Sequence, residues 1–168
     1  GKIISGLSEG SADDPLELDG TSAYVGLFGW INEHARIHDL TLDNVAIYTH
    51  STGSAYVGGI AGRMSGSDTE GDYHGAGIDR CVVKGNITHV TDKGTSFIGG
   101  VVGHMFKGTI INTMSDVTMD GRELSGELAE VGGIVGQRVI DLAVGDAQGH
   151  HDIGRRMGLG EHVLDLET

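Results

Sequence analysis

The side chains best suited to acid–base chemistry are a set of charged residues between positions 79 and 123. They are Asp79, Arg80, Asp116, Asp120, Arg122 and Glu123. Cleavage of a sugar chain needs paired carboxylates, or a basic side chain beside an acid. The alternative interpretation of the same residues is a group of solvated turn charges, because they surround short apolar runs.

A second candidate set shares one position in a repeated motif, directly after a glycine. It consists of Trp30, Arg63, His104 and Gln137. An aromatic, a base, an imidazole and an amide at one position predict side chains that point to solvent, and a face of this kind could bind a partner. The candidate binding residues are therefore Arg63, His104, Asp116, Asp120, Arg122 and Glu123, and no residue is assigned a catalytic role.

Metal chemistry has little support. A zinc peptidase site needs two histidines one helical turn apart with a glutamate between them. Glu33-His34 with His38 has the wrong order, and Glu161-His162 lacks the second histidine. His150-His151-Asp152 resembles a ligand cluster but also suits a polar loop. The sequence predicts no metal site and no cofactor.

The composition limits the classes of partner. The formal net charge of −13 argues against nucleic acid and against anionic membrane surfaces, because both require clustered Lys and Arg. No apolar stretch is long enough for a membrane span, so we expect no membrane insertion. The single cysteine, Cys81, lies in an apolar run and is expected to be a small buried residue. The chain starts without a signal peptide or initiator methionine, so we expect it to be a piece of a longer protein.

The elements that must position these residues repeat along the chain. Glycine accounts for 30 of 168 residues, and many of these glycines recur in one motif. The motif occurs as Tyr24–Trp30, Tyr56–Gly62, Phe97–Gly103 and Glu130–Gly136, at spacings of 32, 41 and 33 residues. The longer spacing contains Ser65–Gly77, a polar, glycine-rich insertion that we expect to be a surface loop.

Short alternating runs follow each motif and predict β-strands. They begin at Ile37, Ile78, Ile110, and Val139 or Ile140. Helical repeats of similar length would need fewer glycines. We predict an all-β fold, a right-handed parallel β-helix (β-solenoid) of about four coils, with one coil and about three strands for each ~32-residue repeat.

Stacked coils place equivalent residues on top of one another. One predicted internal column is Val25, Val57, Ile98 and Val131, and another is Leu27, Ile60, Val101 and Ile134. The aromatic residues of the motif, Tyr24, Phe28, Tyr56 and Phe97, are assigned to the core motif. The repeated glycines are expected at corners where a side chain would clash or where φ must be positive.

These motifs resemble the GLUG repeat. The resemblance rests on Val-Gly-Gly-Ile-x-Gly followed by Ile-x-x-Cys and by Val-Lys-Gly-Asn-Ile-Thr, and on the opening Gly1–Leu7 with Gly26–Gly29 and Leu40–Val45. GLUG repeats occur in bacterial surface proteins, including the amino-terminal region of Gram-positive immunoglobulin A1 metallopeptidases. The resemblance covers residues 1–147 and implies an extracellular protein, secreted or attached to the cell wall.

The repeat fails in residues 148–168, which we predict to be a cap or a linker. Leu159, Val163, Leu164 and Leu166 favour a cap over a free linker.

Three functions remain open. The first is a non-catalytic binding or spacer module of a large surface protein, whose partners would be a host or surface protein, a glycan, or further domains of the parent chain. The second is a polysaccharide-degrading or carbohydrate-binding β-helix, which the small number of aromatics outside the core motif disfavours. The third is an adhesin that pairs through its open end.

Overall fold

The computed structural model describes residues 1–20, 22–66, 75–120 and 128–139, and within these ranges the regular structure is entirely β-strand, with no helix. The strands form four sheets, and every pairing between the named strands is parallel. The predicted all-β class and the parallel pairing are confirmed, and the arrangement is compatible with a β-helix.

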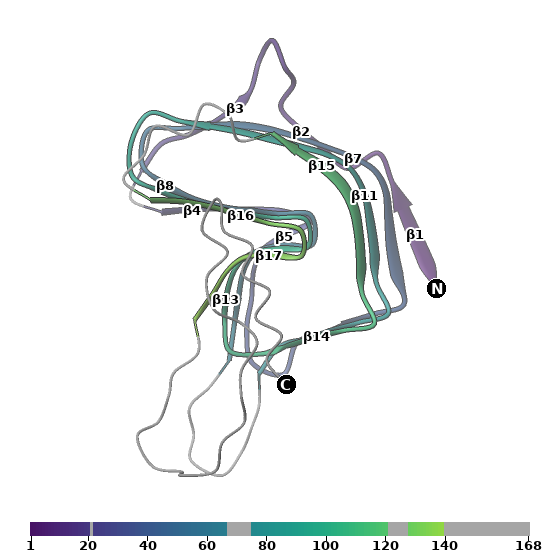
Figure 1. The fold of residues 1–168 in the computed structure, drawn as a ribbon. Helices are drawn as coiled ribbons and strands as arrows, with labels where there is room; N and C mark the ends of the chain where they lie inside the picture. Colours follow the sequence, from purple (N-terminus) through teal and green to yellow (C-terminus); the bar gives the residue numbers. More distant parts are fainter. Residues whose placement is uncertain (21, 67–74, 121–127, 140–168) are drawn as a thin grey trace, which may run out of the picture.

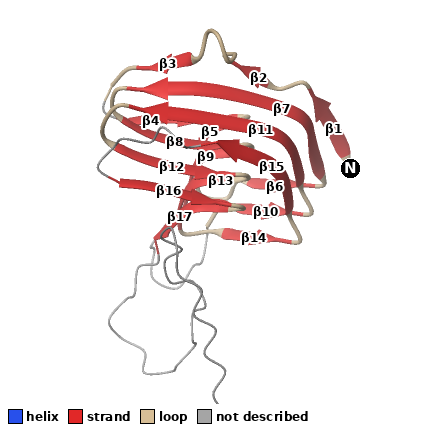
Figure 2. Ribbon diagram, turned by 45° about the horizontal axis from the view of Figure 1, so that its top comes forward, coloured by secondary structure: helices blue, strands red, loops and turns tan. Residues whose placement is uncertain are grey.

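Each sheet takes its strands from equivalent places in consecutive repeats (Figures 1 and 2). The β7 sheet contains β1 (Lys2–Ser5), β7 (Leu40–Ser51), β11 (Val82–Thr91) and β15 (Met114–Asp120), with β2 (Ser8–Glu9) and β3 (Leu16–Leu18) also paired to β7. The β8 sheet contains β4 (Ser22–Val25), β8 (Ser54–Gly58), β12 (Thr95–Gly99) and β16 (Leu128–Gly132). The β9 sheet contains β5 (Phe28–Ile31), β9 (Ala61–Ser65), β13 (Val102–Phe106) and β17 (Val135–Val139). The β10 sheet contains β6 (Arg36–His38), β10 (Gly77–Asp79) and β14 (Thr109–Ile111).

A complete repeat therefore has four strands, one in each sheet, and not the three that the sequence suggested. The runs β4–β7, β8–β11 and β12–β15 are complete repeats, and β16 and β17 belong to a fourth. The extra strand of each repeat is a short one: β6, β10 or β14 in the three complete repeats. Sequence analysis had merged it with the long strand that follows it. A turn with a left-handed residue separates the two: Asp39 has φ 54° and Arg80 has φ 50°.

The interior consists of columns of aliphatic side chains. Val57 pairs in register with Val25 and Ile98, and Ile98 with Val131, as the repeat predicted. Val57, Ile60, Ile98 and Val101 are fully buried. Val131 is 39% exposed, because β16 has a neighbouring strand on only one side within the described residues. Cys81 is fully buried, as expected, and burial raises the pKa of its thiol.

The repeated glycines allow the chain to double back between the β8 sheet and the β9 sheet (Figure 1). A Cβ on Gly62 would lie 2.5 Å from the backbone nitrogen of Val25 and 2.6 Å from the carbonyl oxygen of Tyr56. Gly103 repeats this geometry, with the backbone nitrogen of Val57 at 2.6 Å. Neither glycine has a left-handed φ. Close approach of backbone to backbone, and not φ, is therefore what requires glycine at these positions.

The boundaries predicted for the polar insertion are wrong. Ser65 belongs to β9 and is buried, Ala76 is fully buried, and Gly77 begins β10. Gly66 and Gly75 form an antiparallel bridge that brings the two sides of the insertion together. Residues 67–74 lie outside the described residues.

The start that the sequence predicted for the fourth alternating run, Val139 or Ile140, is wrong at Val139. Val139 pairs with Phe106 at the end of β17, so it is not the equivalent of Ile110 in β14. Ile140 and residues 148–168, including the predicted cap or linker, lie outside the described residues.

Candidate functional site

Six side chains from the β8 and β9 sheets form one surface, which we call the elbow face. It consists of Tyr24, Tyr56, Phe97, Trp30, Arg63 and His104. The first three share one register position across β4, β8 and β12, and the last three share another across β5, β9 and β13. The two columns contact each other, since Tyr24 meets Trp30 and Tyr56 meets His104; between their strands the chain doubles back from the β8 sheet to the β9 sheet (Figure 1).

Strand alternation places both columns on the outer side of their sheets. Ala55 and Val57, on either side of Tyr56, are fully buried in the aliphatic core. Met64, next to Arg63, is also fully buried there. Because successive strand residues point to opposite faces, Tyr56 and Arg63 point away from that core.

The aromatic rings contact one another along the stack. Tyr24 stacks on Tyr56 with ring centroids 5.0 Å apart, and Tyr56 contacts Phe97 at 5.4 Å. The His104 ring stacks on Phe97 at 5.5 Å and meets Tyr56 edge-on at 5.4 Å. The result is a continuous aromatic surface with fixed geometry.

Arg63 lies against two aromatic rings that also contact each other. Its guanidinium carbon is 4.7 Å from the centre of the Trp30 ring and 5.9 Å from that of Tyr24. Its Nη1 donates to the Tyr24 hydroxyl at 3.3 Å. The half-buried side chain makes no ion pair with a carboxylate among the described residues, and its buried Nε has no hydrogen-bond partner there.

Trp30 is the most accessible ring of the elbow face. It is 52% exposed, yet its indole Nε1 donates to Ser65 Oγ at 2.7 Å, and Ser65 Oγ in turn donates to Asn32 Oδ1 at 2.9 Å. Phe28, two residues earlier on β5, is 43% exposed. The indole is therefore held in place while much of its surface remains open.

His104 is neutral at physiological pH. Burial, together with the charge of Arg63, lowers the pKa of His104 from 6.5 to about 4. Its Nδ1 is buried without a hydrogen-bond partner in the described part of the chain. Arg63 is therefore the cation of this surface near neutral pH.

Two predictions about these residues are wrong. Arg63 and His104 do not simply point to solvent: both are half-buried, because the aromatic column of the β8 sheet packs against them. The motif aromatics Tyr24 and Tyr56 are half-buried and lie outside the aliphatic core, whereas Phe97 is 5% exposed and is buried, as its core assignment predicted. Sequence analysis could have found the two tyrosines, because each directly precedes an inward-pointing aliphatic residue, and alternation turns it outward.

The other candidate binding residues are not brought to the elbow face. Asp116 and Asp120 lie on β15 in the β7 sheet, where they pair with Lys84 and Thr88. Arg122 and Glu123 lie outside the described residues. Within the described chain, the acidic candidates and Arg63 therefore belong to different sheets and do not form one site.

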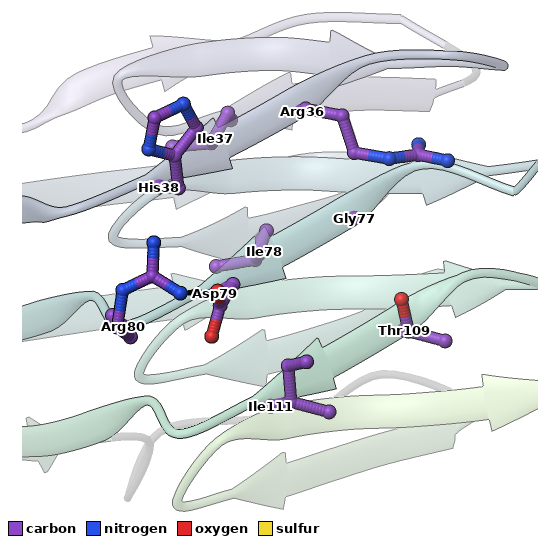
Figure 3. A pocket seen from close by; sticks show the side chains of 9 residues that line it. All are labelled: Arg36, Ile37, His38, Gly77, Ile78, Asp79, Arg80, Thr109 and Ile111. Carbon is purple, nitrogen blue, oxygen red and sulfur yellow. Dashed lines mark hydrogen bonds and ion pairs between the residues drawn. The ribbon is translucent and has the colours of Figure 1, made fainter.

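A pocket of about 450 Å³ lies on the β10 sheet (Figure 3). Gly77 is one of its lining residues and lies between Arg36 and Thr109 of the neighbouring strands, with the Arg36 side chain over it: a Cβ on Gly77 would be 3.0 Å from Arg36 Cδ. Arg36 Nη1 donates to the carbonyl oxygens of Ala35 and Gly75, at 2.9 and 2.6 Å.

The rim of the pocket is an ion cluster between two repeats. Arg80 donates from Nε and Nη2 to the two carboxylate oxygens of Asp39, at 2.7 and 2.9 Å, and from Nη1 to Asp79. The Arg80 guanidinium, with help from His38, holds the pKa of the Asp39 carboxyl far below its usual range. Because Arg80 already has two acidic partners, this cluster links adjacent repeats and offers little unpaired charge to a ligand.

Other kinds of site have no support within the described ranges. They contain no group of three or more His, Cys, Asp or Glu residues that could hold a metal ion. They also contain no helix that is long and apolar enough to cross a membrane.

Comparisons with protein-family models, with curated proteins and with solved structures found no match to this chain.

Proposed function

We propose that the chain is a right-handed β-solenoid of the GLUG-repeat type. The support is the register: equivalent residues of consecutive repeats pair in four parallel sheets. Right-handed crossovers are the rule when parallel strands of one sheet are connected. An experimental structure in which the coils are left-handed would contradict the proposal.

The function we propose is a non-catalytic binding module of a large bacterial surface or secreted protein. The observation that carries it is the elbow face. Trp, Tyr and Arg are the residues that most often dominate binding energy at protein interfaces, and here Trp30, Tyr24 and Arg63 lie together with fixed geometry. A pure spacer has no need of an exposed, immobilised indole.

A carbohydrate-binding role is the second candidate. It was disfavoured from sequence because the motif aromatics were assigned to the core. Tyr24 and Tyr56 point outward and are only half-buried, which weakens that objection, whereas Phe97 is 5% exposed and offers no ring to a sugar.

The test is a binding screen of the full chain against a glycan array and a panel of purified secreted host proteins. We expect a specific ligand whose binding is lost in Trp30→Ala and retained in Lys84→Ala, a change at an exposed cation of the β7 sheet. Ligand binding that survives in Trp30→Ala would exclude the elbow face. No ligand from either class would favour the spacer role.

The parent protein is a separate question. We propose that further domains, such as the catalytic domain of an immunoglobulin-cleaving metallopeptidase, belong to the same polypeptide. Sequencing the native gene beyond the codon for Thr168 tests this, because a zinc-peptidase motif or a cell-wall anchor there would identify the class.

A further inference from the structure

Arg63 is unusual because the described part of this acidic chain gives it no acidic partner. The sequence contains 24 Asp and Glu residues against 11 Lys and Arg. With this excess of acids, a basic side chain is expected to find a carboxylate partner. Arg80 does so, because it forms ion pairs with both Asp39 and Asp79. Arg63 is half-buried, has no carboxylate partner among the described residues, and is fixed over aromatic rings. A partly desolvated guanidinium with unused donors favours a planar anion, above all a carboxylate.

Trp30 provides a second, independent feature next to this cation. Arg63 and Tyr24 lie against the indole, and 52% of Trp30 remains exposed. The hydrogen bond from Nε1 to Ser65 already fixes the ring, so binding orders little that was not ordered before. The negative face of an aromatic ring attracts weakly positive C–H groups. A sugar ring presents such C–H groups on one face and hydroxyls at its edge.

We propose that the elbow face binds a carboxylate-bearing sugar, whose ring stacks on Trp30 and whose carboxylate pairs with Arg63. This inference rests on the proposed binding function and names the ligand class. Asn32, whose Oδ1 accepts from the buried Ser65 hydroxyl that holds the indole, is exposed and offers its amide to the edge of the sugar.

The net charge of the protein narrows the ligand further. With a formal charge of −13, the chain repels densely charged polyanions that come within about a Debye length, roughly 8 Å at physiological ionic strength. One carboxylate in contact with Arg63 is compatible with this field, whereas a polyuronate or a nucleic acid is not. The ligand is therefore an otherwise neutral glycan that ends in a single acidic sugar.

An acidic peptide is the main competing occupant, and the elbow face suits it less well. Peptides often bind by adding a strand to a free sheet edge, but the elbow face is the side-chain surface of the β8 and β9 sheets. The strands β8, β9, β12 and β13 at its centre are paired on both sides. At Arg63 a peptide would therefore depend on side-chain contacts, and among the described strands of the elbow face's first two repeats a free edge exists only on β4 and β5, which carry Tyr24 and Trp30.

Intrinsic fluorescence tests the proposal directly, because Trp30 is the single tryptophan of the chain. The full chain is titrated with a neutral oligosaccharide that carries one terminal glucuronic acid, and in parallel with the methyl ester of the same oligosaccharide. We expect saturable change in tryptophan emission with the acid, and binding at least about tenfold weaker with the ester, which corresponds to about 1.4 kcal/mol.

Variants separate the contribution of charge from that of fold. Arg63→Gln should weaken binding of the acid at least about tenfold and leave the weak binding of the ester unchanged. Arg63→Lys should recover only part of the loss, because lysine lacks the planar fork. Lys84→Gln, which removes an exposed cation from the β7 sheet, is the matched control and should bind as the wild type does. Thermal melting of each variant checks that it is folded.

Each other outcome contradicts a defined part of the proposal. Equal binding of acid and ester would overturn the pairing with Arg63 but leave sugar binding intact. Binding of an acidic peptide without binding of either sugar would overturn the ligand class. No change in emission with the acid at millimolar concentration would overturn the inference, while a ligand found in the wider screen and retained in Arg63→Gln would leave the proposed binding function standing.

Discussion

His89 makes the stability of this fold sensitive to acid. The imidazole is fully buried between the β7 and β8 sheets. Its Nδ1 lies 2.8 Å from Thr49 Oγ1, and its Nε2 lies 3.0 Å from Ser96 Oγ and 3.4 Å from Ser51 Oγ. Burial, assisted by the nearby charge of His50, lowers the pKa of His89 from 6.5 to about 4. The folded state therefore favours the neutral ring.

The sign of the effect follows from which state takes up the proton first. Above pH 6.5 the ring is neutral in both states, and His89 adds no pH dependence. As the pH falls below 6.5, the unfolded chain is protonated before the folded one, so the free energy of unfolding decreases until the pH reaches about 4. The loss is about 2 kcal/mol at about pH 5, and about 3 kcal/mol in full, at about 1.4 kcal/mol per unit of pKa.

Urea unfolding near pH 7.5 and near pH 5, at constant ionic strength, measures this loss. Other groups also titrate in this interval: the hydrogen bond to Glu17 raises the pKa of His50, which acts in the opposite direction. The test is therefore the difference between the wild type and His89→Thr, which carries the residue found at the equivalent position, Thr49, in the preceding repeat.

The variant should be less stable near neutral pH, because it leaves a cavity, but it should lose less stability on acidification. If the wild type and His89→Thr lose the same free energy between the two pH values, within about 0.5 kcal/mol, the buried neutral histidine does not control the acid response.

Three further predictions concern the fold. Ile60→Asp should lower the free energy of unfolding by more than about 3 kcal/mol, because its carboxylate would be buried without a partner; a melting temperature within about 3 °C of the wild type would contradict this. Gly103→Ala should destabilise the protein by about 1–3 kcal/mol, because its Cβ would meet backbone atoms, whereas Gly133→Ala, whose Cβ would meet nothing within 4 Å, should be nearly neutral; equal urea midpoints would refute the close-approach argument. Deleting residues 67–74, so that Gly66 joins Gly75, should leave a soluble folded protein by circular dichroism, because these glycines already form a bridge; an insoluble product would contradict it.

The interior could be predicted from sequence because it follows a local rule repeated in register. Val25, Val57 and Ile98 alternate with outward residues, and their spacing superposes them without any knowledge of the turns. The same rule places Leu42 and Ile87 inside, and both are fully buried. Only the outermost member of a column, such as Val131, departs from it, since its burial depends on having a strand on each side.

The candidate site could be predicted only in part. The register that aligns Trp30, Arg63 and His104 came from the repeat and is confirmed. The half-burial of Arg63 and His104 depends on the fold-back at Gly62 and Gly103, which brings a second sheet against them, and no local pattern encodes the angle of that turn. The pocket at Gly77 was missed because the glycine was assigned to a surface insertion.

The columns of this protein differ in how much their chemistry changes from one repeat to the next. The inward column keeps Val, Val and Ile at successive positions, because each side chain must fill the same space above its neighbour. The outward column changes from Trp30 to Arg63, His104 and Gln137, although the backbone register stays constant. Ladder packing therefore does not dictate the outward side chains. Within the elbow face the exposed ring and Arg63, which has no carboxylate partner among the described residues, both lie in the first two repeats. If the surface binds a ligand, its affinity should come from this end of the stack, while the later repeats support the aromatic column and hold its rings in place.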